Sequence, residues 1–322
     1  MTHAVLHRPF AALLLGAALA HSAVAAMPPP VRLASVRADN SAVHPSFTVR
    51  VVGKGRPVLL IPGLTCPGAV WDETVAYYQG RYQCHVVSLA GFGGVPAASG
   101  HTSASFLPAV RDQLLAYIKS QKLDRPVIIG HSLGGFLGLW LSTTQPEAVG
   151  PLVILDSLPF LAAIQNPATT VETTRPLAEG MRQQMRAGKM PLAQQRQMAA
   201  GMVSDTARQS LVARWGQASD PASVAQAMYE LYTIDLRAEL GAVRQPALVL
   251  GTWAAYQPYG ATLASTRAIF AAQYTRLPQH RIEMSQTGKH FIMYDDTAWF
   301  FQQTDAFLQA NYAVKAKDLS KK

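Results

Sequence analysis

A serine between glycines is the first candidate for chemistry in this chain. The pentapeptide Gly130-His-Ser-Leu-Gly134 follows a short apolar run at residues 127–129 and precedes an apolar segment, rich in small residues, at 136–141. This order predicts a strand, a tight turn and a helix. In such a turn the Ser132 hydroxyl projects from the carboxyl end of the strand, and the N–H of Leu133 points into the same space. Ser132 is therefore the candidate nucleophile, and a plain strand-to-helix turn is the alternative.

A serine hydroxyl needs a general base to act as a nucleophile. Only residues just past the carboxyl ends of the strands reach the ligand crevice of an open α/β sheet. His290 meets this condition, because it lies in Thr287-Gly-Lys-His-Phe291 after the last predicted strand. His101, in a loop, remains an alternative, whereas His131 inside the turn is expected to point away from the serine.

The base in turn needs an acid that orients it. Asp156 directly follows the apolar run at residues 152–155, which is the strand after the one that carries the serine. The rule for strand ends therefore favours Asp156. The chain order becomes Ser132, Asp156, His290, which is the order of an α/β-hydrolase triad.

Three other aspartates compete for this role, and each has a structural explanation. Asp295 and Asp296 precede the last predicted helix, where a carboxylate caps the first turn well. Asp235 lies before a predicted strand rather than after one. Asp156 is therefore preferred, with a hydrogen bond to the neighbouring loop as its alternative role.

Negative charge that develops on a substrate carbonyl needs two N–H donors, an oxyanion hole. Leu133 supplies one donor. The other is expected from the loop after the strand at residues 57–61, where Gly63 lets the backbone turn. Leu64 is the candidate donor and Thr65 is its neighbour, and a tight turn without this role is the alternative.

Short apolar strands alternate with helical segments along most of the chain. The strands at residues 57–61 and 127–129 are apolar without alternation, which is typical of a parallel sheet covered on both faces. The rhythm stops at Ser157 and resumes at residues 247–250. The segment between contains no convincing strand. We therefore predict an α/β fold, with a mostly parallel central sheet, helices on both faces and a helical cap inserted after the sixth strand.

These motifs resemble the α/β-hydrolase superfamily, in its capped, serine-nucleophile, esterase- or lipase-like form. The resemblance rests on Ile61-Pro-Gly-Leu64, Leu89-Ala-Gly-Phe92, Gly130-His-Ser-Leu-Gly-Gly135 and Gly288-Lys-His-Phe291. It implies an acyl-enzyme mechanism in which Ser132 attacks a carbonyl and water later releases the acid. The segment after the seventh strand, where members commonly carry the acid, has no carboxylate. The position after the sixth strand, which some members use instead, holds Asp156.

The amino terminus has the pattern of an export signal. Arg8 is the only charged side chain before residue 32, an apolar run follows at residues 10–20, and small residues surround Ala25. An exported protein, periplasmic or secreted, is expected, and a retained membrane anchor is the alternative. The predicted organisation is a signal peptide (1–26), a first part of the core (27–156), a helical cap (157–243), a second part of the core (244–314) and a disordered basic tail (315–322).

Composition excludes several classes of function. The net charge of +9 is not arranged as a basic stripe with aromatic residues, so no nucleic-acid partner is expected. No cofactor motif or metal site is expected either, and no stable membrane insertion after signal cleavage. Cys66 and Cys84 are expected to be free thiols, because they would lie at opposite ends of neighbouring strands. The sequence does not predict an oligomeric state.

A small, fairly apolar carboxylic ester is the predicted substrate. The alternatives on the same triad are an aminopeptidase, a lactonase, a haloperoxidase or a carbon–carbon hydrolase, and a non-catalytic binding protein is a further one. An aminopeptidase would need cap carboxylates for the substrate ammonium, with Glu172, Glu179 and Glu230 as candidates. Besides Thr65, the candidate pocket residues are Trp253 and Tyr256, which follow the seventh strand.

Overall fold

The computed structural model of the 322-residue chain describes residues 37–38, 44–98 and 105–312. Three predicted features lie outside the described residues, namely the signal peptide (1–26), the basic tail (315–322) and His101. The export signal therefore stays a prediction. Within the described residues, no helix is long and apolar enough to cross a membrane.

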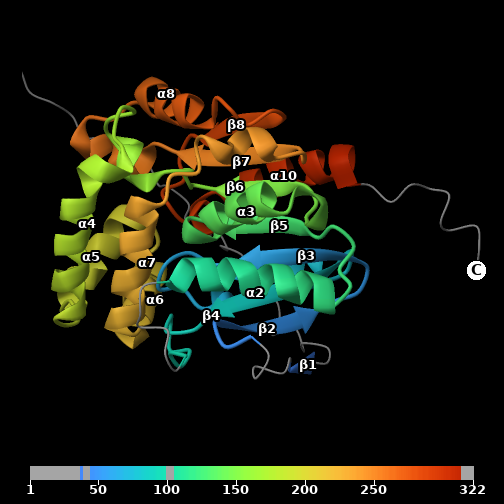
Figure 1. The fold of residues 1–322 in the computed structure, drawn as a ribbon, viewed down its shortest axis with the longest axis horizontal. Helices are drawn as coiled ribbons and strands as arrows, with labels where there is room; N and C mark the ends of the chain where they lie inside the picture. Colours follow the sequence, from blue (N-terminus) through green and yellow to red (C-terminus); the bar gives the residue numbers. More distant parts are fainter. Residues whose placement is uncertain (1–36, 39–43, 99–104, 313–322) are drawn as a thin grey trace, which may run out of the picture. The chain divides into compact units, whose positions relative to one another are not determined.

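An eight-stranded sheet organises the described part of the chain, in the order β1-β2-β4-β3-β5-β6-β7-β8 (Figure 1). The strands are β1 (Arg37–Ala38), β2 (Phe47–Val52), β3 (Arg56–Ile61), β4 (Tyr82–Leu89), β5 (Val127–His131), β6 (Leu152–Leu155), β7 (Ala247–Thr252) and β8 (His280–Ser285). The pairs β1–β2 and β2–β4 are antiparallel, and the remaining pairs are parallel. The mostly parallel sheet predicted from the sequence is confirmed.

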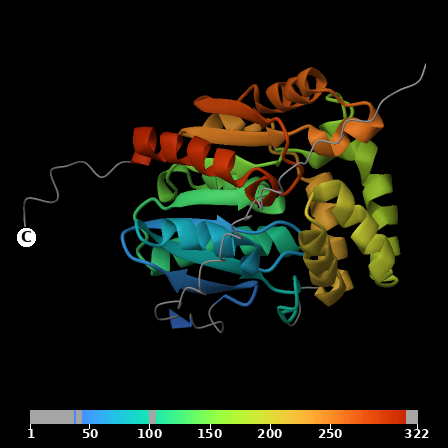
Figure 2. The ribbon, with the colours of Figure 1, turned by 180° about the vertical axis from the view of Figure 1, so that it is seen from behind.

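Helices cover both faces of this sheet, because successive residues of each central strand point to opposite sides and are apolar on both. In β3, Leu59 and Ile61 pack into one core, whereas Val58 and Leu60 pack into the other. The first core contains α2 (Phe106–Ser120), α3 (Leu133–Thr144) and α8 (Leu263–Tyr274), and the second contains α1 (Asp72–Tyr78) and α10 (Thr297–Tyr312) (Figures 1 and 2).

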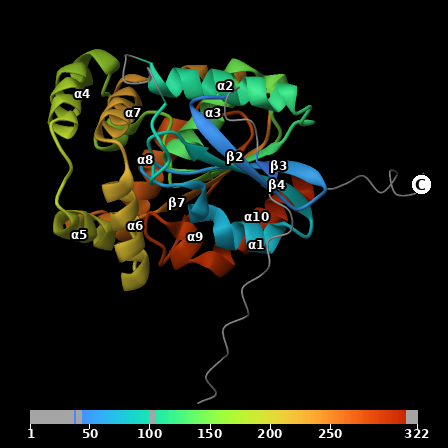
Figure 3. The same ribbon diagram turned by 90° about the horizontal axis from the view of Figure 1, so that it is seen from below.

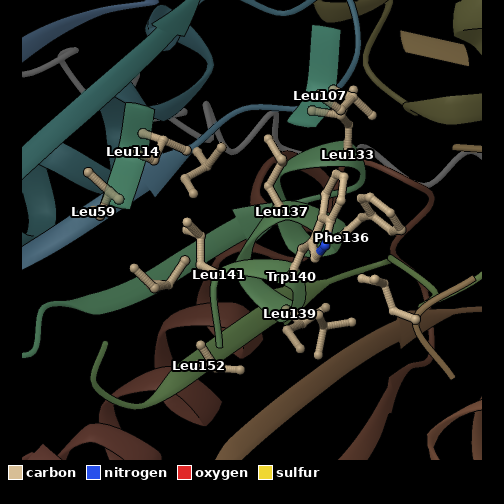
Figure 4. Packing of buried hydrophobic residues seen from close by; sticks show 14 of the residues in the cluster. Leu59, Leu107, Leu114, Leu133, Phe136, Leu137, Leu139, Trp140, Leu141 and Leu152 are labelled. Carbon is tan, nitrogen blue, oxygen red and sulfur yellow. The ribbon is translucent and has the colours of Figure 1, made fainter. Parts of the chain in front are cut away.

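The helix after the serine, α3, is buried in the first core. Leu137 and Leu141 from α3 lie in one cluster with Leu59 of β3 and Leu114 of α2 (Figure 4). Its apolar, small-residue composition allows this close approach to the sheet. The sequence pattern that predicted a helix packed on a sheet is therefore explained by burial of most of the helix surface.

All regular secondary-structure elements between β6 and β7 are helices. This segment contains the 3-10 helix η3 (Leu161–Ile164) and the helices α4 (Val171–Arg186), α5 (Leu192–Met202), α6 (Thr206–Ala218) and α7 (Pro221–Thr233). Helix α4 packs with α7, which lies beside α2, while α5 packs with α6 near the short helix α9 (Ile292–Asp295) (Figure 3). We call this segment the insertion. The predicted boundaries of a cap, 157–243, stay a prediction.

The two cysteines are free and buried. Cys84 pairs with Val58 near the start of β3, whereas Cys66 follows the end of β3, so the two thiols lie toward opposite ends of neighbouring strands. Burial raises the pKa of each thiol to about 12. Both cysteines therefore remain protonated, and they serve as small apolar core residues.

The turn from β5 into α3 requires a glycine at position 134. A Cβ atom at this position would overlap the backbone carbonyl of Ile61 in β3. The strand, the turn and the helix can therefore approach one another only without a side chain here.

We expect Gly134→Ala to lower the free energy of unfolding by about 1–3 kcal/mol or more, because backbone on both sides cannot relax easily. Gly180→Ala is the matched control, since Gly180 lies in α4 and an added Cβ meets nothing within 4 Å. That variant should gain roughly 0.5–1 kcal/mol. Urea titration measures both changes, and equal stability of the two variants would contradict this account of the turn.

Candidate active site

Ser132 lies in the sharp turn between β5 and α3, in a backbone conformation that a serine rarely adopts. Its φ and ψ angles are 53° and −119°. Such a conformation costs roughly 1–3 kcal/mol and persists only where surrounding structure enforces it. The N–H of Ser132 donates to the carbonyl of Leu155 at the end of β6 (2.8 Å), and the glycines on either side leave room. The strained turn thereby keeps the Ser132 hydroxyl at the carboxyl edge of the sheet.

Asp156 and His290 are joined by a short hydrogen bond. His290 Nδ1 lies 2.6 Å from Asp156 Oδ2, and the Asp156 side chain is only 2% exposed. The other carboxylate oxygen accepts the N–H of Thr252 at 3.2 Å. A carboxylate can only accept, so Nδ1 of His290 carries the proton and Nε2 is left free to take another.

Hydrogen bonds to residues at the ends of the strands hold the loop that carries His290. Gly288 donates its N–H to the Ser285 hydroxyl (2.7 Å), and its carbonyl accepts the hydroxyl of Thr252. The carbonyl of His290 itself accepts from Nε2 of His131 at 3.0 Å. These contacts place His290 between the ends of β7 and β8.

His131 lies against His290, with 4.6 Å between the ring centroids. Burial, and then the neighbouring charge of His290, hold the pKa of His131 well below its ordinary value. His131 is therefore neutral, and because its Nε2 donates to the His290 carbonyl, the proton is on Nε2. His131 thus supports the loop that carries His290.

The three competing aspartates have other partners. Asp295 accepts from Ser204 and Lys289, and Asp296 accepts the hydroxyl of Ser285. Asp235 accepts several hydrogen bonds from Arg237. Of the four aspartates considered from the sequence, the structure brings Asp156 to His290.

The oxyanion-hole candidates lie on two segments that approach each other closely. Leu133 is the first residue of α3, where the backbone N–H groups have no partner within the helix. A Cβ atom added to Gly63 would come within 3.3 Å of the Cβ of Ser132, so the loop that carries Leu64 lies against the serine turn. Thr65 adopts a positive φ of 62° in this loop.

A cavity of about 700 Å³ opens at the serine. It is lined by Ser132, Leu133, Phe136, Asp156, Ser157, Leu158, Leu161, Ile164, Gln165, Leu231, Tyr256, Gly260, Ala261, Ser265, Thr266, Ile269, Phe270 and His290. Ser132, Asp156 and His290 thus share one cavity with two further predicted residues, Leu133 and Tyr256. Leu64, Thr65 and Trp253 are not among its lining residues.

The ionisable residues of the lining are Asp156, His290 and Tyr256. The negative charge of Asp156, followed by burial, raises the pKa of Tyr256, so this phenol stays neutral. Sequence reasoning missed most of the wall, because many of its apolar side chains come from η3, α7 and α8. Their helical periodicity shows a buried face but not which cavity that face borders. Within the described residues, no group of three or more His, Cys, Asp or Glu side chains is arranged to hold a metal.

Comparison with known proteins identifies the family. Residues 58–303 match the alpha/beta hydrolase family, which is well over half of the chain. The chain therefore belongs to the alpha/beta hydrolase family. Among solved structures, the esterase RhEst1 from Rhodococcus sp. ECU1013 is similar, with a TM-score of 0.66 and 16% identity over 86% of this chain and 100% of that one. At this identity the likeness shows the fold.

Two similar curated proteins are named as esterases. The chain is 33% identical over 117 residues to the pimeloyl-(acyl-carrier protein) methyl ester esterase of Vibrio atlanticus (strain LGP32), over 36% of this chain and 42% of that protein. The esterase of the same name from Nitrosomonas europaea is 29% identical over 213 residues, 64% of this chain and 79% of the relative. The chain thus spans less than half the length of the first of these relatives.

If Ser132, Asp156 and His290 act as a hydrolytic triad, Asp156→Asn should lower kcat for an ester by about 10³- to 10⁴-fold, because an amide cannot hold His290 in the required tautomer or stabilise its positive form. Asp235→Asn is the matched control and should hydrolyse esters at a rate close to that of the unmodified protein. Steady-state kinetics with p-nitrophenyl butyrate measures both. If the Asp156 variant stayed active while folded, the acid would have to be sought elsewhere.

Proposed function

We propose that this protein is a serine hydrolase that cleaves small, fairly apolar carboxylic esters through an acyl-enzyme. The observation that carries the proposal is the 2.6 Å hydrogen bond between Asp156 and His290, in a cavity that also contains Ser132. The esterase names of the similar curated proteins agree with this chemistry.

In the proposed mechanism, His290 Nε2 removes the proton of the Ser132 hydroxyl as its oxygen attacks the ester carbonyl. The N–H groups of Leu133 and Leu64 stabilise the oxyanion, and the Asp156 carboxylate stabilises the imidazolium. The intermediate collapses, the ester C–O bond breaks, and His290 returns the proton to the departing alcohol. Water, activated by His290, then attacks the acyl-enzyme, which releases the carboxylic acid and restores Ser132.

The cavity lining supports an uncharged, apolar substrate. Aliphatic and aromatic side chains dominate the wall, and Lys, Arg and Glu do not occur in it. A charged substituent would lose its hydration there without gaining a partner, which is costly. Leu231 of α7 contributes to the wall, so we propose that the insertion acts as a cap over the site.

An aminopeptidase is less well supported. Glu172 and Glu179 are surface residues, and Glu179 pairs with Arg182. Glu230 is buried, but its carboxylate accepts the N–H groups of Phe106 and Leu107 at the start of α2. None of these three carboxylates lines the cavity, and the carboxylate of Asp156, which does, is already bonded to His290 and Thr252. A substrate ammonium would therefore find no free carboxylate among the lining residues.

The proposal predicts that the protein without residues 1–26 hydrolyses p-nitrophenyl acetate and butyrate, and that Ser132→Ala loses at least about 10³-fold in kcat. This loss follows from removal of the nucleophile while the fold is kept. Release of p-nitrophenol measures the rate, and circular dichroism checks the fold. An inactive wild-type protein on every ester offered, or an active Ser132→Ala variant, would refute the proposal.

The cavity wall predicts a length limit for the apolar substituent of the ester. Ile269→Trp should lower kcat/KM for p-nitrophenyl octanoate by about tenfold more than for the acetate, because the larger ring fills space that the longer chain needs. Ala268→Trp adds the same ring at the neighbouring exposed position of α8, outside the lining, and should preserve the ratio. If Ile269→Trp left the ratio of the two kcat/KM values unchanged, the octanoyl group would have to bind outside this cavity.

A further inference from the structure

The carboxylate of Asp295 bridges two segments that are far apart in the sequence. It accepts the N–H of Lys289, the residue before His290, at 3.1 Å. It also accepts the N–H of Ser204 at 3.0 Å and the Ser204 hydroxyl at 3.2 Å. Ser204 lies between α5 and α6 of the insertion. One side chain therefore joins the insertion to the loop that carries the proposed base.

Two further hydrogen bonds run between the same segments. The N–H of Phe291, the residue after His290, donates to the carbonyl of Met202 at 3.1 Å. The Lys289 ammonium donates to the carbonyl of Ala200 at 2.7 Å. Both neighbours of His290 are thus bonded to the end of α5.

Apolar packing supports the same contact. Ala199, Val203 and Val212, from α5, the junction and α6, are buried in one cluster with Phe291 and Ile292. No residue of α5 or α6 lines the cavity. This half of the insertion therefore meets the site through the His290 loop, whereas α7 meets it through Leu231 in the wall.

We propose that Asp295 is a positioning residue for His290, and that the junction of α5 and α6 is the support to which it ties the loop. The proposal rests on the ester hydrolysis proposed above. His290 must keep Nδ1 on Asp156 while Nε2 reaches Ser132, so a small shift of the loop breaks one of the two contacts. A displacement of about 1 Å can cost about 10²-fold in rate.

The test is Asp295→Ala, which leaves two N–H groups and a hydroxyl without their acceptor. We expect kcat for p-nitrophenyl butyrate to fall about 10- to 100-fold, with KM changed by less than about threefold, because Asp295 does not line the cavity. Asp295→Asn keeps one acceptor oxygen and should lose less activity. Hydrogen exchange of residues 286–291 should become faster in Asp295→Ala, and this readout does not depend on any substrate.

Asp205→Ala is the matched control. Asp205 follows Ser204 and caps α6 by accepting the N–H of Arg208 at 2.8 Å, so its loss weakens the same junction. We expect a lower melting temperature, with kcat and exchange of the His290 loop close to those of the unmodified protein.

Several outcomes would overturn this inference. They are an Asp295→Ala variant with kcat within twofold of an active wild-type protein, an Asp205→Ala variant that loses kcat equally, and unchanged exchange of the His290 loop in Asp295→Ala. An inactive wild-type protein in which Asp295→Ala still accelerates that exchange would refute the proposed hydrolysis but support the bridge.

Discussion

A carboxylate as buried as that of Asp156 is stable only if its oxygens are hydrogen-bonded, and here they are shared between His290 Nδ1 and the N–H of Thr252. This requirement ties together three parts of the chain: the end of β6, the end of β7 and the loop after β8. It also fixes the tautomer of His290. The orientation of the proposed base is thus a consequence of burying one charge.

The parallel sheet supplies the positions for this arrangement. The carboxyl ends of β5, β6, β7 and β8 meet at one edge, so Ser132, Asp156 and His290 come together although they are far apart in the sequence. The glycine-rich turn adds a strained serine, and the buried His131 holds the backbone of His290. The insertion contributes at two places, a cavity wall through α7 and an attachment for the His290 loop through the junction of α5 and α6.

The strand-end rule made much of this site predictable. Ser132 and Asp156 directly follow apolar strands and His290 lies in the loop after β8, so their approach could be expected from topology alone. The structure brings the predicted acid and base into contact. The pocket was less predictable. Trp253 follows β7 as Tyr256 does, yet only Tyr256 lines the cavity, because side-chain direction after a strand depends on the loop conformation.

The remaining features that the sequence did not predict depend on tertiary contacts. Ile269 and Phe270 lie on a helix whose periodicity marks a buried face without naming the neighbour that it meets. Asp295 was considered as a helix cap or as a competing acid, but its partners come from a segment about ninety residues away. Such long-range pairing leaves no signal in local spacing.

The most direct test of an activated Ser132 is covalent labelling with a fluorophosphonate, followed by peptide mapping. The reagent reacts with a serine that a neighbouring base activates. We expect one adduct, on the peptide that contains Ser132, and a much slower reaction in the His290→Gln variant. An adduct at another residue, no adduct, or an equal rate in His290→Gln would contradict an activated serine at this site.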